Sequence, residues 1–158
     1  MENKELTISY QVLTYEELNE SDKNLIDAAR EATYTCYAPY SNFHVGAAVR
    51  MSNQEILKGS NQENAAFGAG TCAERTTLFY AHAHLPKESI EEIAIAARGT
   101  NDDFTISYIA PCGICRQALL EAEKRAQKPI RVLLYGKKEI IVVKSVSDLL
   151  PFQFNEIV

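Results

Sequence analysis

Two short stretches of the sequence, TCAER and PCGIC, hold side chains that could bind a metal ion and move a proton. The first places Cys72 two positions before Glu74, and the second places Cys112 and Cys115 in a Pro-Cys-x-x-Cys arrangement. Each stretch lies at a predicted helix start, where a thiol loses its proton more easily. Three thiolates leave one position of a tetrahedral zinc ion open for water, which is typical of a catalytic site. The sequence therefore predicts one Zn²⁺ per chain, held by the three cysteines.

Either stretch alone is open to other interpretations. Cys-x-x-C at a helix start also fits a thioredoxin-like redox pair or half of a structural zinc site. A glutamate in a first helical turn often does no more than complement the helix dipole. The redox interpretation leaves Cys72 and Glu74 unexplained, and a structural zinc site would need a fourth protein ligand. In the combined pattern, Glu74 is free to take a proton from water and return it to a substrate.

Arg75 follows the glutamate directly and has a predicted role in balancing charge. Zinc with three thiolates carries a formal charge of about −1, which weakens its power to acidify water. Two helix N-termini contribute roughly +0.5 each. A hydrogen bond from Arg75 to a ligand sulfur would restore more of the Lewis acidity.

Composition places this chemistry in one globular domain. The chain has 158 residues, a formal charge of −5 and no apolar run approaching a membrane span of about 20 residues. The acidic balance disfavours a nucleic acid polymer as partner, because such partners favour basic surfaces. The polar N-terminus predicts neither a signal peptide nor a membrane location. We therefore expect a cytoplasmic protein, in which the four cysteines remain thiols or metal ligands.

Hydrophobic periodicity predicts helices alternating with apolar strands. Helices are expected at about 15–35, 72–85 and 112–127, with a short one near SDLL, and strands at 43–51, 56–63, 90–98, 130–136 and 139–145. Residues 6–13 could be a short strand or an extended arm. This order predicts an α/β fold, a three-layer α/β/α sandwich with a mixed sheet of about five strands. We expect residues 1–20 to be an N-terminal extension and residues 21–158 to be a catalytic domain.

Four segments together resemble the small, homotetrameric, zinc-dependent cytidine deaminases: YAPYSNFHVGAAV, KGSNQENAAFGAGTCAER, APCGICRQ and SDLLPFQF. The combination of Cys-x-Glu with Pro-Cys-x-x-Cys is the three-cysteine form of the zinc deaminase signature. The resemblance covers about 120 of the 158 residues. It implies the cytidine-deaminase fold, a nucleoside substrate, water as co-substrate, and hydrolysis of cytidine and deoxycytidine to uridine and deoxyuridine with release of ammonia, as in pyrimidine salvage.

The resemblance also implies roles for individual residues. Cys72, Cys112 and Cys115 match the zinc ligands, and Glu74 matches the proton shuttle. The expected substrate contacts are Asn61 and Glu63 on the ribose 3′-hydroxyl, Phe43 on the pyrimidine, and Ala65, Phe67 and Phe154. Residues i and i+2 of a strand share one face, which suits Asn61 and Glu63 to gripping a sugar.

The chain departs from the family pattern at three positions, and these leave the ligand set intact. Phe67 stands where relatives often have Tyr, so that a contact near the ribose 5′ end is in doubt. His44 replaces a frequent Pro, and Ala110 a frequent Ser.

Alternatives within the same chemistry are a deaminase for another small heterocycle and an editor of polynucleotides. Asn61 and Glu63 oppose the first because they imply a ribose. No basic, aromatic strand-binding segment supports the second.

Exposed aromatic residues would mark an interface, and the predicted cluster of Phe67, Phe152 and Phe154 favours a homotetramer whose active sites are completed across subunits. The remaining possibility is that these side chains close the core of a monomer.

Overall fold

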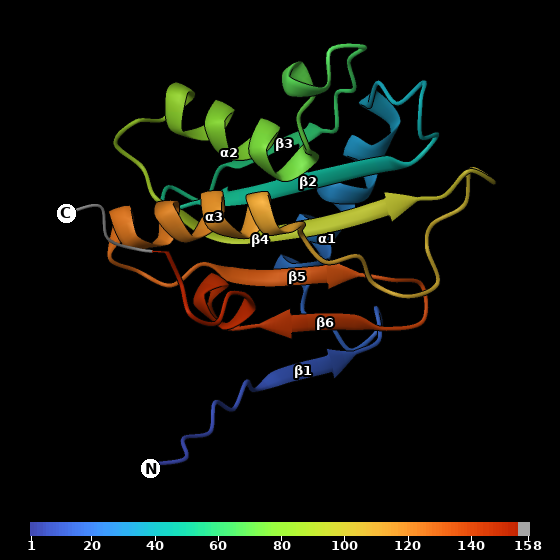
Figure 1. Cartoon of the computed structure of the whole chain (residues 1–158). Coiled ribbons are helices and arrows are strands. Elements are labelled where there is room, and N and C mark those ends of the chain that lie inside the picture. Colours follow the sequence, from blue (N-terminus) through green and yellow to red (C-terminus); the bar gives the residue numbers. More distant parts are fainter. Residues whose placement is uncertain (155–158) are drawn as a thin grey trace.

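A six-stranded mixed sheet forms the centre of the molecule, with helices on both faces (Figure 1). It is a computed structural model, and it describes residues 1–154. The strands are β1 (Tyr10–Leu13), β2 (His44–Met51), β3 (Ile56–Ser60), β4 (Ile90–Arg98), β5 (Arg131–Tyr135) and β6 (Ile140–Val143). The helices are α1 (Glu20–Ala32), α2 (Ala73–His84) and α3 (Gly113–Ala126), with 3₁₀ turns η1 (Thr33–Thr35), η2 (Phe67–Ala69) and η3 (Val146–Leu149).

The strand order is β1-β6-β5-β4-β2-β3, and every neighbouring pair is antiparallel except β4 and β5. The parallel pair follows from the chain path, because α3 carries the chain from the end of β4 back to the start of β5. Within the described residues no helix is long and apolar enough to cross a membrane.

Two hydrophobic cores lie on opposite faces of the sheet. Helices α2 and α3 pack on one face and α1 packs on the other (Figure 1). Alternate residues of β2 serve the two cores: Ala47 and Val49 face α2 and α3, whereas Ala48 faces α1. Gly46 allows the close approach of α1, since a Cβ atom there would lie 2.1 Å from the carbonyl oxygen of Ala29.

The expected three-layer α/β fold is confirmed, with corrections at the edges. The sheet has six strands rather than about five, because part of the segment 6–13 pairs with β6 as β1. The first helix begins later than expected, at Glu20, where the Asn19 side chain caps the backbone N–H of Asp22 at 2.8 Å. The predicted C-terminal helix is the 3₁₀ turn η3. The division at residue 20 stays a prediction, and residues 155–158 of the expected catalytic domain lie outside the described residues.

Candidate active site

Two of the three predicted ligands are the N-cap residues of neighbouring helices. Cys72 caps α2 and Cys112 caps α3, both with extended backbone and without a side-chain capping hydrogen bond. Cys115 lies in the first turn of α3 and is fully buried. Each of these two cysteines ends a long loop, 61–72 after β3 and 99–112 after β4, and the helix begins at the next residue. Both sulfurs at the N-caps are therefore free to bind something else.

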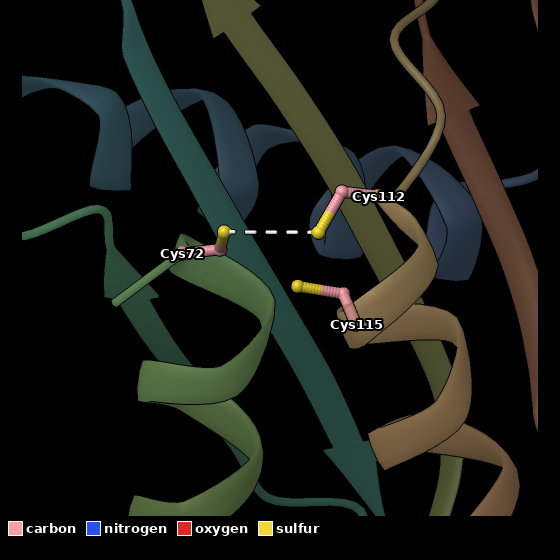
Figure 2. A group of neighbouring side chains, drawn as sticks. All are labelled: Cys72, Cys112 and Cys115. Atoms are coloured by element: carbon pink, nitrogen blue, oxygen red, sulfur yellow. Dashed lines mark hydrogen bonds between the residues drawn. The ribbon is translucent and has the colours of Figure 1, made fainter. Parts of the chain in front are cut away.

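The three sulfur atoms point toward one another from the two helix starts (Figure 2). The Sγ atoms of Cys72 and Cys112 are 4.0 Å apart, and all three lie within 4.8 Å of one another. Tetrahedral zinc with bonds of about 2.3 Å holds its sulfur ligands roughly 3.8 Å apart, whereas a disulfide needs about 2.05 Å. The residues fit a zinc ion, with one Zn²⁺ per chain.

The ligand cluster already favours negative charge on one sulfur. A hydrogen bond from Cys115 lowers the pKa of Cys72 to about 5, and Arg75 assists with a guanidinium nitrogen 3.9 Å from the Cys72 sulfur. The pKa of Cys115 is raised, because its thiol donates to Cys72 and is buried. The Arg75 Nε atom is buried without a hydrogen-bond partner among the described residues. These three sulfurs are suited to binding a cation, which would favour loss of the proton from the other two thiols as well.

Glu74 lies in the first turn of α2 beside the sulfur cluster, and it is 5% exposed. Burial raises the pKa of its carboxyl group. The Cys72 charge raises the pKa further, while a hydrogen bond with Cys115 opposes these effects. A buried carboxyl group with a raised pKa can both accept and return a proton near neutral pH. The proton-shuttle role of Glu74 stays a prediction, with which its burial beside the thiols is compatible.

A cavity of about 350 Å³ opens beside Cys72, within the range of small-molecule sites. Six of the residues predicted from the sequence line it together: Asn61, Glu63, Ala65, Phe67, Cys72 and Arg75. Tyr40, Gln62 and Thr71 also line it and were not predicted. The place of Gln62 in the cavity wall could not be predicted from local sequence, because it depends on tertiary contacts. The Gln62 backbone forms isolated bridges to Tyr37 and to Thr71.

The predicted sugar-binding pair already binds the chain itself. The Asn61 side chain accepts from the Val45 N–H and donates to the Phe43 carbonyl, both at 2.9 Å. The Glu63 carboxylate accepts from the Tyr40 N–H at 2.8 Å. These contacts hold the loop that carries Phe43, which is half-buried and does not itself line the cavity.

Phe154 lies away from this cavity. Its carbonyl accepts a hydrogen bond of 2.8 Å from the Gln117 side chain, and Phe154 lines a separate groove between α2 and α3. Phe79 and Ile114 line the same groove and are 57% and 65% exposed. The expectation that Phe154 belongs to the substrate site therefore stays a prediction. It requires Phe154 of one subunit to reach the cavity of a neighbouring subunit.

A mixed sheet flanked by helices, with three thiols converging from two helix starts beside a buried glutamate, defines the class of zinc-dependent deaminases. Residues 19–128 match the family model described as the cytidine and deoxycytidylate deaminase zinc-binding region. The chain belongs to this family.

Individual relatives agree with the family match. The cytidine deaminase of Halalkalibacterium halodurans is 38% identical over 131 residues, covering 83% of this chain and 92% of that protein. The probable cytidine deaminase of Dictyostelium discoideum is 33% identical, covering 83% and 82%. Among solved structures, cytidine deaminase from Burkholderia pseudomallei superposes with a TM-score of 0.72 at 40% identity, covering 83% and 97%. The resemblance inferred from the sequence is confirmed.

Proposed function

We propose that this chain hydrolyses cytidine and deoxycytidine to uridine and deoxyuridine, with release of ammonia, as a pyrimidine salvage enzyme. The observation that carries the proposal is the group of three converging thiols beside the buried Glu74, next to a cavity of nucleoside size. Family membership supports the reaction type. The chain covers 92% and 97% of two cytidine deaminases that it resembles, so the proposal extends to the complete deamination reaction.

Cys72, Cys112 and Cys115 would hold the zinc ion. Zinc bound there supplies a Lewis acid, which makes water a nucleophile near neutral pH. Glu74 takes a proton from water and delivers it to N3 of the pyrimidine, and it then helps to protonate the departing amine. A C4–O bond forms and the C4–N bond breaks, so that the water protons end on N3 and on ammonia. Burial suits Glu74 to this role because it raises the pKa of the carboxyl group above its ordinary value, so that the group holds a proton more readily.

The cavity residues would hold the nucleoside. Asn61 and Glu63 line the cavity with an amide and a carboxylate, which suit a sugar hydroxyl. Ala65 and Phe67 line the same wall, and Phe43 is proposed to pack against the base once substrate is present. Arg75 reaches both the cavity and the Cys72 sulfur, where its charge offsets that of the thiolates.

The direct test is incubation of pure, zinc-loaded protein with cytidine, followed by assays for uridine and for ammonia. Both products should appear in equal amounts, and removal of zinc by a chelator should abolish their formation. Free cytosine and a cytidine-containing oligonucleotide serve as controls for the two alternative substrate classes. Turnover of either control in preference to cytidine would contradict the proposal.

We also propose that the protein works as a homotetramer in the cytoplasm. Exposed apolar side chains support an assembly, because Phe79, Ile114 and Phe154 line one groove and Phe67 is fully exposed at the cavity. A reducing compartment would keep the three ligand thiols available for zinc. Light scattering at assay concentration tests the assembly. An active particle with the mass of one chain, 17.6 kDa, would contradict it.

A further inference from the structure

The Ser41 hydroxyl lies between the cavity carboxylate and the loop that carries Phe43. Its Oγ atom donates to Glu63 Oε1 at 2.5 Å and accepts from the Phe43 N–H at 3.1 Å. The Ser41 N–H also reaches Glu63 Oε2, at 3.3 Å. One hydroxyl thus connects the side chain proposed to contact the sugar with the backbone of the residue proposed to contact the base.

The loop on either side of Ser41 leaves it little freedom. Asn42 adopts a left-handed conformation with φ of 52°, and its N–H donates to the Ala38 carbonyl at 3.0 Å. On the far side of Phe43, the Asn61 amide fixes the Phe43 carbonyl. Ala38 is buried, but residues 39–42 are exposed and belong to neither core. The shape of the loop around Ser41 therefore depends on these hydrogen bonds more than on packing.

The charge of Glu63 strengthens this connection. The hydrogen bond from Ser41 lowers the pKa of the Glu63 carboxyl group, so that it accepts as a carboxylate. Hydrogen bonds to charged groups contribute more than those between neutral groups. Loss of the hydroxyl would leave the Phe43 N–H without its acceptor and Glu63 without its shortest contact.

We propose that Ser41 is a positioning residue for the deamination, which fixes Glu63 and the Phe43 backbone relative to each other so that sugar and base are held as one unit. The inference rests on the proposed function. Ser41 does not line the cavity and touches none of the reacting groups. It acts through Glu63 and Phe43, so its loss should weaken substrate binding more than the chemical step.

The chain offers a matched control at the opposite end of β2. The Ser52 hydroxyl donates to Glu88 Oε2 at 2.5 Å and accepts from the Ser89 N–H at 3.1 Å. This is the same pair of hydrogen bonds, made by a serine just after β2 instead of just before it. An eight-residue strand separates the two serines by roughly 25 Å. Ser52→Ala therefore removes an equivalent contact far from the site.

The experiment compares cytidine kinetics of the zinc-loaded wild type with those of Ser41→Ala, Ser41→Thr and Ser52→Ala. Ser41→Ala should raise KM about 10-fold or more, with kcat within about threefold and zinc content unchanged. Ser41→Thr retains the hydroxyl and should recover KM to within about threefold of wild type. Ser52→Ala should leave both parameters unchanged. If Ser41→Ala does not fold, Ser41→Cys, which has a weak donor of similar shape, replaces it.

A double-mutant cycle with Glu63→Ala identifies the route by which Ser41 acts. If Ser41 works through Glu63, the double variant should bind cytidine little worse than Glu63→Ala alone. Fully additive effects, or a KM for Ser41→Ala within twofold of wild type, would overturn the inference while leaving the proposed function intact. A wild-type protein that does not deaminate cytidine would overturn both.

Discussion

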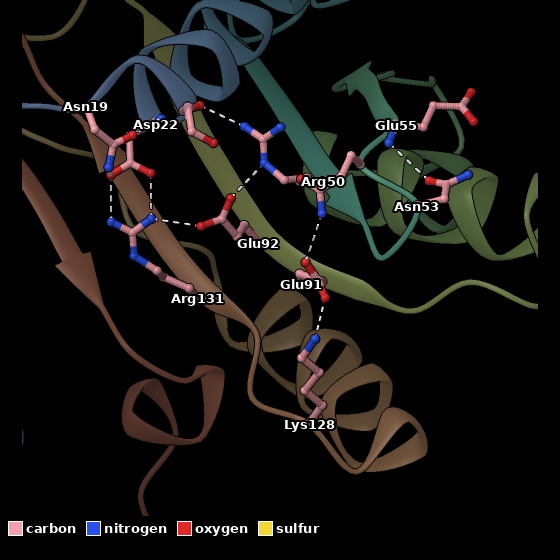
Figure 3. A network of polar contacts seen from close by, with 11 residues as sticks. Asn19, Asp22, Arg50, Asn53, Glu55, Glu91, Glu92, Lys128 and Arg131 are labelled. Carbon is pink, nitrogen blue, oxygen red and sulfur yellow. Dashed lines mark hydrogen bonds and ion pairs between the residues drawn. The ribbon is translucent and has the colours of Figure 1, made fainter.

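The end of the sheet where β2 finishes holds four charged side chains that pair with one another, whereas the end where β2 begins holds the three thiols. In the charged network (Figure 3), Arg131 donates to both oxygens of Asp22, at 2.6 and 2.7 Å, and to Glu92 at 2.8 Å. Arg50 donates to the other Glu92 oxygen at 2.9 Å and to the Ser21 carbonyl at 2.7 Å. Each carboxylate is thus shared by protein donors from another element.

The thiol end is not closed in this way. Glu74 is buried with a raised pKa, and three sulfurs lie within 4.8 Å of one another. The Arg75 Nε atom is buried and has no hydrogen-bond partner in residues 1–154. Unsatisfied and crowded groups cost stability, which the rest of the protein must supply. The comparison indicates that the network end ties α1 to β2, β4 and β5, and that the thiol end is shaped for ligands. The two ends should therefore respond differently to equivalent substitutions.

The largest effect should come from Glu74→Gln. The amide cannot shuttle a proton, so kcat should fall by about 10²- to 10⁴-fold, while zinc binding and the unfolding temperature are retained. Steady-state kinetics, metal analysis and a thermal melt measure the three quantities. Glu92→Gln removes the same charge at the network end and should lower stability with little change in kcat. Activity of Glu74→Gln within a few-fold of wild type would remove it from its proposed role.

Asp22→Ala should have the opposite signature. It leaves the Arg131 guanidinium without its two-pronged partner and removes an acidic side chain from the first turn of α1. Removing one member of a buried pair costs about 3 kcal/mol, which urea unfolding would detect. The kcat of the folded protein should stay within about twofold. A loss below about 1 kcal/mol would show that solvent replaces the missing carboxylate.

This contrast also explains what the sequence could predict. Cys72, Glu74 and the Cys-x-x-Cys pair were recognisable because local spacing and helix starts carry the pattern. The main helices and strands were recognisable because each buries a periodic apolar face. The 6–13 segment remained ambiguous, since the pairing of Tyr10 with Val143 depends on a partner strand far along the chain.

The charged network and the loop contacts were also unpredictable, because they too depend on partners far along the chain. Asp22 and Arg131 are 109 positions apart, and nothing local distinguishes them from surface charges. The dual use of Asn61 is also hidden, because its hydrogen bonds to Phe43 and Val45 appear only when the loop folds back beside β3. Spacing indicates which residues do chemistry, whereas tertiary contacts decide what holds them.

Asn61→Ala tests that dual use. The variant loses an amide from the cavity and leaves the Val45 N–H and Phe43 carbonyl without their partner. KM for cytidine should rise about 10-fold or more. Asn53→Ala is the matched control at the other end of β2, where the Asn53 side chain accepts from the Glu55 N–H in the β2–β3 turn (Figure 3). It should leave KM unchanged; an equal rise in both variants would contradict a site-specific role.

The smallest effect should be the acid sensitivity contributed by Glu123, near the end of α3 opposite Cys112. Its carboxylate is buried and accepts from the Ile130 and Val146 N–H groups, each at 2.8 Å, and from the Ser147 hydroxyl at 2.5 Å. Burial raises the pKa of this group, but the hydrogen bonds outweigh burial, so that the net pKa is lowered. Glu123 therefore joins α3 to η3 and to Ile130, the residue before β5, most strongly when it is charged.

The sign of the pH dependence follows from the lowered pKa. The contribution of Glu123 is fully present above its unfolded pKa of about 4.3, and it is lost as the pH falls through the lower folded value. Glu123→Gln should thus be less stable than wild type by about 1 kcal/mol at pH 7. The gap should narrow as the pH falls below the unfolded pKa of about 4.3, because the unfolded wild type takes up a proton there and the folded protein does so only at its lower pKa. Glu121→Gln, on the exposed face of the same helix, should show no gap at either pH. Urea unfolding at pH 7 and pH 3.5 measures the free energy of unfolding of each variant relative to wild type. If the difference for Glu123→Gln does not change with pH, the carboxylate charge adds nothing to the contacts of Glu123 with Ile130 and η3.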